Sequence, residues 1–221
     1  MKHILVFSII ALLTSCKSIP KEYLVEDIIC NYNDPIFMVN KNEFIINLDI
    51  LKELNEKKRS ITLVDDQNYK NRYSTLSSGN IINYQTNKQS RISKWISYRK
   101  DGSIKQSSFN YRNGNSKLFK ETHYDEQGSI TKVIDYEKGY TICWAEAIEI
   151  VKKIAKRDIE KYEVTGFNLT HSNLNKFPNV KPEWVISLNG NEEYQRKPYK
   201  FYHIDGVTGK FIKTTTATLT P

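Results

Sequence analysis

The chain has 221 residues and a formal net charge of +8, from 33 basic and 25 acidic residues. This length suits one large domain or two small ones. The basic residues are dispersed without a run of five Lys or Arg, which argues against a nucleic-acid groove and is typical of a solvated basic surface. Contact with anionic lipid headgroups or with an acidic partner is the alternative interpretation of this charge.

The N-terminus has the composition of a secretory signal. Lys2 gives a basic start, and an apolar run of about ten residues follows at positions 4–13. A membrane-spanning helix needs about 20 apolar residues, so this run is too short to be one. The junction Leu13-Thr14-Ser15-Cys16 resembles the lipobox of bacterial lipoproteins. The resemblance implies that residues 1–15 are a signal peptide and that Cys16 carries the lipid that anchors the protein to a membrane.

The lipoprotein resemblance also implies a location in the bacterial envelope. Position 17 is Lys, and not the Asp that retains many lipoproteins of this family in the inner membrane. We therefore expect an outer-membrane anchor with the protein facing the periplasm. Residues 16–22 are predicted to be the lipidated tether. Cleavage removes one basic residue, Lys2, and leaves an excess of seven positive charges.

Two further cysteines remain once Cys16 is lipidated. Cys30 and Cys143 would lie in an oxidising compartment, where disulfides persist. A bridge between them would close a loop of about 113 residues, which the chain-entropy model associates with roughly 4–5 kcal/mol. The alternative is a pair of separate buried thiols, since free Cys is a small apolar residue that often lies in cores.

Residues 23–139 are predicted to be rich in β-structure. Residues 23–30 form a first candidate strand, and the β-branched run at 61–64 forms another that ends at Asp65. Between them Leu48, Leu51 and Leu54 recur at a spacing of three, which indicates a short amphipathic helix.

The middle of the chain carries a repeat of tyrosines and turn signals. The tyrosines recur every 11 to 14 residues, at Tyr73, Tyr84, Tyr98, Tyr111, Tyr124 and Tyr136. Asp101-Gly102, Asn113-Gly114 and Gln127-Gly128 follow the later ones and favour tight hairpin turns, because these residues tolerate positive φ. Apolar and polar residues alternate between the turns. The pattern predicts an antiparallel meander with one strand for each repeat.

The repeat is similar to two known families. The stretch Tyr124-Asp125-Glu126-Gln127-Gly128 resembles a YD-type unit of long secreted β-proteins. The Tyr/Gly spacing, taken in pairs near 26 residues, is similar to MORN-like hairpin repeats. Both resemblances imply stacked strand–turn–strand units.

Four of the tyrosines are candidate binding residues. A twisted meander with a row of Tyr at its edge could bind a protein or a glycan, because aromatic side chains anchor interfaces. The alternative is that these rings form core and cross-strand pairs. The candidates are Tyr98, Tyr111, Tyr124 and Tyr136.

The composition changes after Gly139, and residues 144–157 are the strongest helix candidate in the chain. Trp144, Ile148 and Val151 share one helix face, and Thr141 is a candidate N-cap. Strands are predicted over residues 162–169, 183–188, 200–204 and 210–212. Asp205-Gly206-Val207-Thr208-Gly209 is predicted to be the turn before the last strand, with Asp205 capping it.

Residues 140–221 resemble a PepSY domain. The helix at 145–155, the strand at 184–188 and the hairpin at 202–212 follow one another in the order of that family. The resemblance implies a helix packed on a small antiparallel sheet, in a unit that is non-catalytic in that family. The predicted fold class of the whole chain is therefore α+β.

The sequence lacks the motifs of catalysis and metal binding. His123, His171 and His203 are far apart and stand in no H-E-x-x-H pattern. G-x-S-x-G, Walker and G-x-G-x-x-G motifs are absent from the sequence. We therefore expect no catalytic residue, metal or cofactor, and interpret the histidines as ordinary strand residues.

These observations predict a non-catalytic lipoprotein that binds a protein partner at the envelope and does not bind nucleic acid. One alternative is an immunity lipoprotein that neutralises an exported toxin. A second alternative is a protease inhibitor, which only the PepSY resemblance suggests, since some members of that family occur in protease propeptides.

Overall fold

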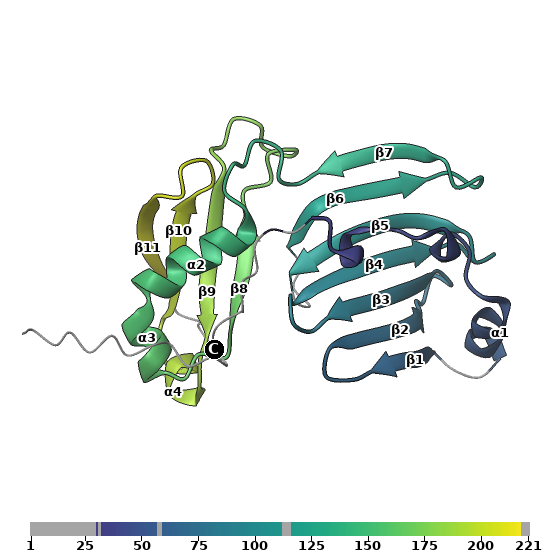
Figure 1. The fold of residues 1–221 in the computed structure, drawn as a ribbon, viewed down its shortest axis with the longest axis horizontal. Helices are drawn as coiled ribbons and strands as arrows, with labels where there is room; N and C mark the ends of the chain where they lie inside the picture. The colour runs from purple at the N-terminus through teal and green to yellow at the C-terminus, as the bar shows by residue number, and fades with distance from the viewer. Residues whose placement is uncertain (1–29, 31, 57–58, 112–115, 218–221) are drawn as a thin grey trace, which may run out of the picture.

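The computed structural model describes residues 30, 32–56, 59–111 and 116–217, and shows an α+β protein with two antiparallel sheets (Figure 1). The predicted signal peptide, the tether with Cys16 and most of the candidate strand at 23–30 lie outside these residues. Within the described ranges, none of the helices has the length and apolar character needed to cross a bilayer.

The larger sheet has seven strands in the order β1-β2-β3-β4-β5-β6-β7, each paired antiparallel with the next (Figure 1). One repeat tyrosine lies in each strand from β2 to β6, and Tyr136 directly follows β7. The prediction of a meander with one strand per repeat is therefore confirmed. The strands are β1 (Ser60–Asp65), β2 (Tyr69–Thr75), β3 (Ile81–Asn87), β4 (Ile92–Tyr98), β5 (Ile104–Tyr111), β6 (Lys117–Tyr124) and β7 (Ile130–Asp135).

Three hairpin turns at one end of this sheet share one geometry. In the β4–β5 turn the Arg99 N–H donates to the Ser103 carbonyl, and the Gly102 N–H donates to the Arg99 carbonyl. The β2–β3 and β6–β7 turns repeat both bonds, with Gly79 and Gly128 in the place of Gly102. The three glycines have φ of +79°, +85° and +80°, as a three-residue hairpin loop requires. The Asn113-Gly114 turn lies outside the described residues.

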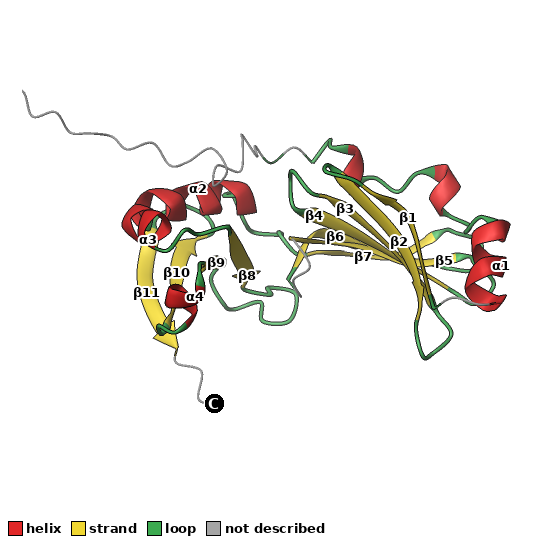
Figure 2. Cartoon of the chain, turned by 90° about the horizontal axis from the view of Figure 1, so that it is seen from below, coloured by secondary structure: helices red, strands yellow, loops and turns green. Residues whose placement is uncertain are grey.

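An N-terminal segment covers one face of the meander (Figure 2). It contains the 3₁₀ turns η2 (Pro35–Phe37) and η3 (Lys41–Glu43) and the helix α1 (Leu48–Glu56). The predicted leucine helix is confirmed, although Leu54 is buried while Leu48 stays 76 % exposed. Ile46 and Leu54 close a core with apolar residues of the sheet.

A buried ion pair ties this segment to the sheet. The Lys94 Nζ lies 2.8 Å from Glu43 Oε1 and 2.8 Å from the Met38 carbonyl oxygen, to which it donates. The Lys94 side chain is only 2 % exposed. Gln85 adds a hydrogen bond to the same carboxylate, so the buried charges have polar partners on both sides.

The C-terminal unit packs two helices against a four-stranded sheet of order β11-β10-β9-β8 (Figures 1 and 2). Trp144 and Val151 of α2 share its core with Trp184 of β9. Its elements are α2 (Trp144–Ile154), α3 (Lys156–Lys161), β8 (Gly166–His171), β9 (Glu183–Asn189), α4 (Glu192–Gln195), β10 (Tyr199–Asp205) and β11 (Phe211–Ala217). The predicted helix, the later strands and the Asp205 turn are confirmed, with Asp205 accepting from the N–H groups of Val207 and Thr208.

Several boundaries of this unit differ from the prediction. The helix predicted over 144–157 ends at Ile154 and is followed by the separate helix α3, and the strand predicted over 210–212 extends to Ala217. Cys143, and not Thr141, caps α2: its Sγ accepts from the Glu146 N–H, and the Glu146 carboxylate accepts from the Cys143 N–H. β8 begins at Gly166 and not at Tyr162, because α3 continues to Lys161 and Glu163 then takes a φ of +47°. The extended chain of β8 therefore begins only after this position.

The two sheets share one apolar core. Phe109, Tyr111 and Leu118 of the meander belong to the same cluster of buried side chains as Trp144 and Trp184 of the C-terminal unit. The Tyr111 and Trp144 rings lie 5.3 Å apart between centroids. The two units are therefore joined by side-chain packing as well as by the covalent connection of the backbone.

Candidate functional site

The meander has a covered face and an open face, and strand alternation decides which side chains reach each. In β4, Ile92, Ile96 and Tyr98 point to the covered face and are fully buried. Trp95, between them, points to the opposite face, which we call the open face. Among the described residues, η2, η3 and α1 lie on the covered side only (Figure 2).

Three of the four candidate tyrosines lie in the core, and the four do not form one surface. Tyr98, Tyr111 and Tyr124 are 0 %, 2 % and 8 % exposed. Tyr98 stacks near Tyr73, while Tyr124 packs edge-on against Phe44 of the N-terminal segment. Their burial supports the interpretation as core and cross-strand pairs and keeps the three rings from a partner. Tyr136 is half-buried at the far end of the sheet.

The open face has a cross-strand row that carries its largest side chains. Thr62, Arg72, Tyr84, Trp95 and Ser108 lie directly opposite one another across β1 to β5. Tyr84 and Trp95 are half-buried and pack edge to face, with centroids 5.3 Å apart and ring planes at 70°. The row places a guanidinium and two aromatic rings side by side at the centre of the face.

Polar side chains, together with the apolar Ile82, flank this row on both sides. On one side the paired residues are Lys70, Thr86, Ser93, Asn110 and Lys117. On the other side they are Ser60, Ser74, Ile82, Ser97, Gln106, His123 and Lys132. Hydroxyl and amide groups therefore surround the aromatic pair.

Hydrogen bonds fix the centre of the open face. The Ser93 hydroxyl lies 3.0 Å from the Thr86 hydroxyl and 3.3 Å from the Tyr84 hydroxyl. The Arg72 Nε donates to the Ser60 hydroxyl at 2.7 Å. The Trp95 Nε1 has no hydrogen-bond partner among the described residues. The hydrogen bonds thus hold the aromatic pair in place, and the indole N–H of Trp95 is buried within it.

The charges of the open face leave a positive excess. Hydrogen bonds from Lys88 and Lys70 lower the pKa of Asp65 at one edge. Burial raises the pKa of Glu121 at the other, but hydrogen bonds from Lys117 and its charge outweigh burial, so that the pKa lies below its usual value. Both acids are therefore neutralised by neighbouring cations, whereas Arg72 and Lys132 form no ion pair within the described part of the chain.

A small hollow adjoins the open face where the meander meets the C-terminal unit. Its volume is about 310 Å³, and it is lined by Ser116, Lys117, Tyr136, His171 and Asn173. The His171 Nε2 donates to the Lys117 carbonyl at 2.6 Å and so joins β8 to β6. Lys117 thus belongs both to the open face and to this seam.

The three histidines lie apart and each is engaged within the fold. His123 bonds Glu121 at 2.7 Å on the open face, and His171 lies in the seam. His203 lies between Glu183, 2.5 Å from its Nδ1, and Thr215, 2.8 Å from its Nε2. This carboxylate–imidazole–hydroxyl chain has the order of a hydrolase triad. Each of its bonds joins neighbouring strands, so it serves as a tie across β9, β10 and β11.

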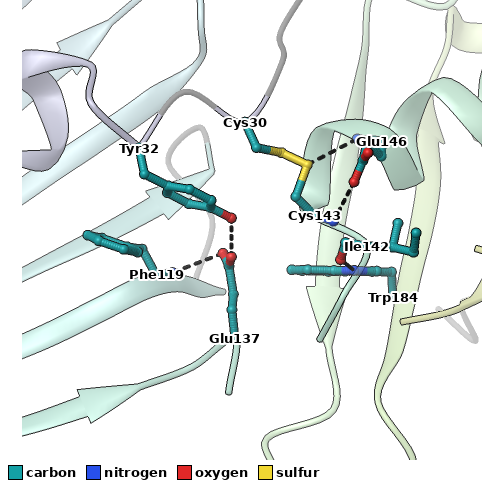
Figure 3. Close-up of a disulfide and its surroundings, with 8 residues drawn as sticks. All are labelled: Cys30, Tyr32, Phe119, Glu137, Ile142, Cys143, Glu146 and Trp184. Carbon is teal, nitrogen blue, oxygen red and sulfur yellow. Dashed lines mark hydrogen bonds between the residues drawn. A yellow bond between two sulfur atoms is a disulfide. The ribbon is translucent and has the colours of Figure 1, made fainter. Parts of the chain in front are cut away.

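Cys30 and Cys143 are joined in a disulfide, with their Cα atoms 6.3 Å apart (Figure 3). The bridge links the start of the N-terminal segment to Cys143, which is the N-cap residue of α2. Beside it, Tyr32 donates to the Glu137 carboxylate, and Tyr32 stacks on Phe119 at 4.9 Å. The carboxylate of Glu146 lies close to both sulfurs. The segment is therefore held at the seam by covalent, polar and aromatic contacts.

No family model, curated protein or solved structure matches the chain. The residues at the centre of the open face, Arg72, Tyr84 and Trp95, were not among the sequence candidates. The signal for Trp95 was present in Ile92-Ser93-Lys94-Trp95-Ile96-Ser97, where small hydroxyl residues accompany Trp95 at a period of two. That alternation places Trp95 opposite to the buried isoleucines.

Proposed function

We propose that the protein is a non-catalytic lipoprotein of the bacterial envelope that binds a protein partner through the open face of its meander. The observation that carries this proposal is the central row of Arg72, Tyr84 and Trp95. Trp, Tyr and Arg are the residues that most often dominate binding energy at protein interfaces. The surrounding Ser, Thr, Asn and Gln resemble the adaptable polar contacts of antibody paratopes.

The geometry favours a protein over a glycan. A sugar ring stacks flat on an aromatic face, and extended glycan platforms need rings that lie in one plane. Tyr84 and Trp95 are inclined at 70° and form no such plane. An edge-to-face pair in the middle of the sheet offers a fixed, partly exposed feature that suits a folded partner.

The charge of the open face suggests which proteins fit it. Arg72 and Lys132 have no acidic partner among the described residues, and the whole chain carries +8. A partner with an acidic surface would complete these charges and would associate faster at low ionic strength. The excess of positive charge on the open face is small, so apolar and polar contacts at Trp95 would supply most of the affinity.

The rest of the molecule supports this role. The lipobox-like junction at Cys16 would anchor the protein to the outer membrane facing the periplasm. We propose that residues 140–221 are a PepSY-like unit, supported by α2, β9 and the β10–β11 hairpin in the order of that family. In this proposal the unit braces the meander through the shared core and performs no chemistry.

Photo-crosslinking in intact envelopes tests the proposed surface. A photoreactive amino acid at position 95 should capture one specific partner, and the same residue at position 177 should not. Phe177 is the matched control because it is an exposed aromatic residue in the C-terminal unit, outside the row of Arg72, Tyr84 and Trp95. With the purified partner, Trp95→Ala should weaken binding by about 2 kcal/mol, or roughly 30-fold, as expected for a central aromatic anchor.

Two results would contradict the proposal. One is equal capture from positions 95 and 177. The other is unchanged affinity of Trp95→Ala for the captured protein. If the captured partner is a toxin, the binding function would be identified as that of an immunity lipoprotein.

A further inference from the structure

We infer that Cys30, Cys143 and Glu146 form a zinc site when the disulfide is reduced. Each of the three residues places one ligand atom within 4.8 Å of the other two. Two thiolates and a carboxylate are a ligand set that Zn²⁺ accepts, with a water molecule as the fourth ligand of a tetrahedral site. The disulfide and the zinc site use the same sulfur atoms, so they exclude each other.

The local structure holds the ligands in place before any metal binds. Cys143 is the N-cap of α2, and the Glu146 N–H points at its sulfur from 3.5 Å. Glu146 in turn accepts from the Cys143 N–H at 2.9 Å, which keeps its carboxylate beside the two sulfurs (Figure 3). This hydrogen bond leaves the second carboxylate oxygen for a metal ion. Such supporting bonds orient the ligands of established metal sites.

The helix also favours the chemical state that zinc requires. A metal-bound cysteine is a thiolate, and the N-terminus of a helix stabilises a thiolate through its exposed N–H groups and its dipole. Cys143 occupies this position at the start of α2. Cys30 and Cys143 are half-buried and Glu146 is exposed, so an ion can reach the cluster from solvent.

The change between the two states balances as a thiol–disulfide exchange. A dithiol reductant attacks one sulfur of the bridge, passes through a mixed disulfide, and leaves as a disulfide itself. Cys30 and Cys143 each gain one hydrogen in this step. Zinc binding then releases both thiol protons to the solvent and forms two Zn–S bonds and one Zn–O bond.

Zinc titration of the full chain tests the inference. Cys16→Ser serves as the background, so that only Cys30 and Cys143 contribute sulfur. After reduction with a phosphine and removal of oxygen, calorimetric titration with zinc chloride should show one ion bound per chain. The oxidised chain should bind at least 100-fold more weakly. Glu146→Gln, which keeps an amide oxygen in the same place, should weaken binding to the reduced chain at least tenfold.

Further measurements separate the site from other zinc binding. Bound zinc should protect both cysteines from alkylation, and should raise the melting temperature of the reduced chain but leave that of the oxidised chain unchanged. Equal zinc binding by the oxidised and reduced chains, or by Glu146→Gln and its parent, would overturn the inference. Loss of folding on reduction, seen by circular dichroism and not reversed by zinc, would overturn it as well. None of these outcomes bears on partner binding at Trp95.

Discussion

Lys94 shows how a single charged residue can specify the way the N-terminal segment lies on the meander. Its ammonium group is buried and is bonded to Glu43 and the Met38 carbonyl, both in the segment that covers the sheet. A buried charge without its partner lowers the stability of the fold, whereas an apolar side chain at the same place needs no partner. The pair therefore favours one placement of η3 over others that would leave Lys94 unpaired.

We predict that Glu43→Leu destabilises the protein by about 3–5 kcal/mol, because it strands the buried ammonium group of Lys94. The double variant Glu43→Leu with Lys94→Met removes both charges and should recover most of this loss. Urea titration followed by tryptophan fluorescence measures both values. A double variant as unstable as the single one would show that the ion pair itself, and not the stranded charge, controls stability.

Glu137 is a half-buried acid whose titration should appear in the stability of the protein. Burial raises its pKa above the usual 4.5, and hydrogen bonds from Tyr32 and from the Phe119 N–H oppose part of this shift. The folded chain therefore keeps the Glu137 proton to a higher pH than the unfolded chain does. Where the folded state binds more protons, the free energy of unfolding falls as pH rises.

We predict that this contribution is fully present below the unfolded-state pKa of Glu137, near 4.5, and is lost as pH rises through its higher folded-state pKa. Glu137→Gln cannot titrate, so the stability of the wild type relative to this variant should decrease from pH 4.5 to pH 8. Urea titrations of both proteins across that range measure the difference. A constant difference would mean that Glu137 titrates alike in the two states.

The hairpin turns are the elements in which sequence and structure agree most closely. Gly128 has a φ of +80°, and a Cβ atom at this position would lie 3.2 Å from the Phe44 ring. We predict that Gly128→Ala destabilises the protein by about 1–2 kcal/mol, because alanine is strained at positive φ and the ring must move. Ser129→Ala in the same turn is the control, and thermal melts would measure both; equal effects would refute the prediction.

The meander could be predicted from the sequence because its signals are local. Three of the hairpins carry a glycine turn, and strands such as β3 and β4 alternate at a period of two, so the strand order follows from the chain itself. The cap of α2 was missed for a different reason. Cys143 is an unusual N-cap, and its choice over Thr141 depends on where the Cys30 disulfide and the Ile142 contact with Trp184 hold the chain.

The open face was missed because burial depends on tertiary contacts. Tyr84 and Tyr98 belong to the same repeat, but they lie on opposite faces of the sheet. Which face is covered is decided by the N-terminal segment, which ends at Glu56, before the first strand begins, and no local pattern records where that segment lies. The sequence therefore indicated aromatic strands without indicating which rings a partner can reach.

At the scale of the whole molecule, the two sheets are joined through a shared core. Phe109, Tyr111 and Leu118 of the meander are buried in the same cluster as Trp144 and Trp184. Separation of the units would expose these side chains, and burying one large apolar side chain contributes about 1.5–3 kcal/mol. The shared core therefore couples the stability of the two units.

We predict a single unfolding transition for the oxidised chain. Differential scanning calorimetry should give equal calorimetric and van't Hoff enthalpies, because separating the units would open the core that they share. Tyr111→Ala, in the shared core, should lower the transition without splitting it. Two separate transitions in either protein would show that the sheets unfold independently.

If Cys16 carries the proposed lipid, the disulfide at Cys30 also sets how far the folded part can move from the membrane. Cys16 precedes Cys30 by 14 positions. A chain of that length spans at most roughly 50 Å when fully extended. A lipid on Cys16 would thus confine the covalently fastened body to a shallow layer above the bilayer, about twice as deep as the stretch 16–22 alone would allow. Within that layer the molecule could present the row around Trp95 to proteins that lie in the membrane or close to it. Proteins farther away would have to diffuse into the layer before they could bind.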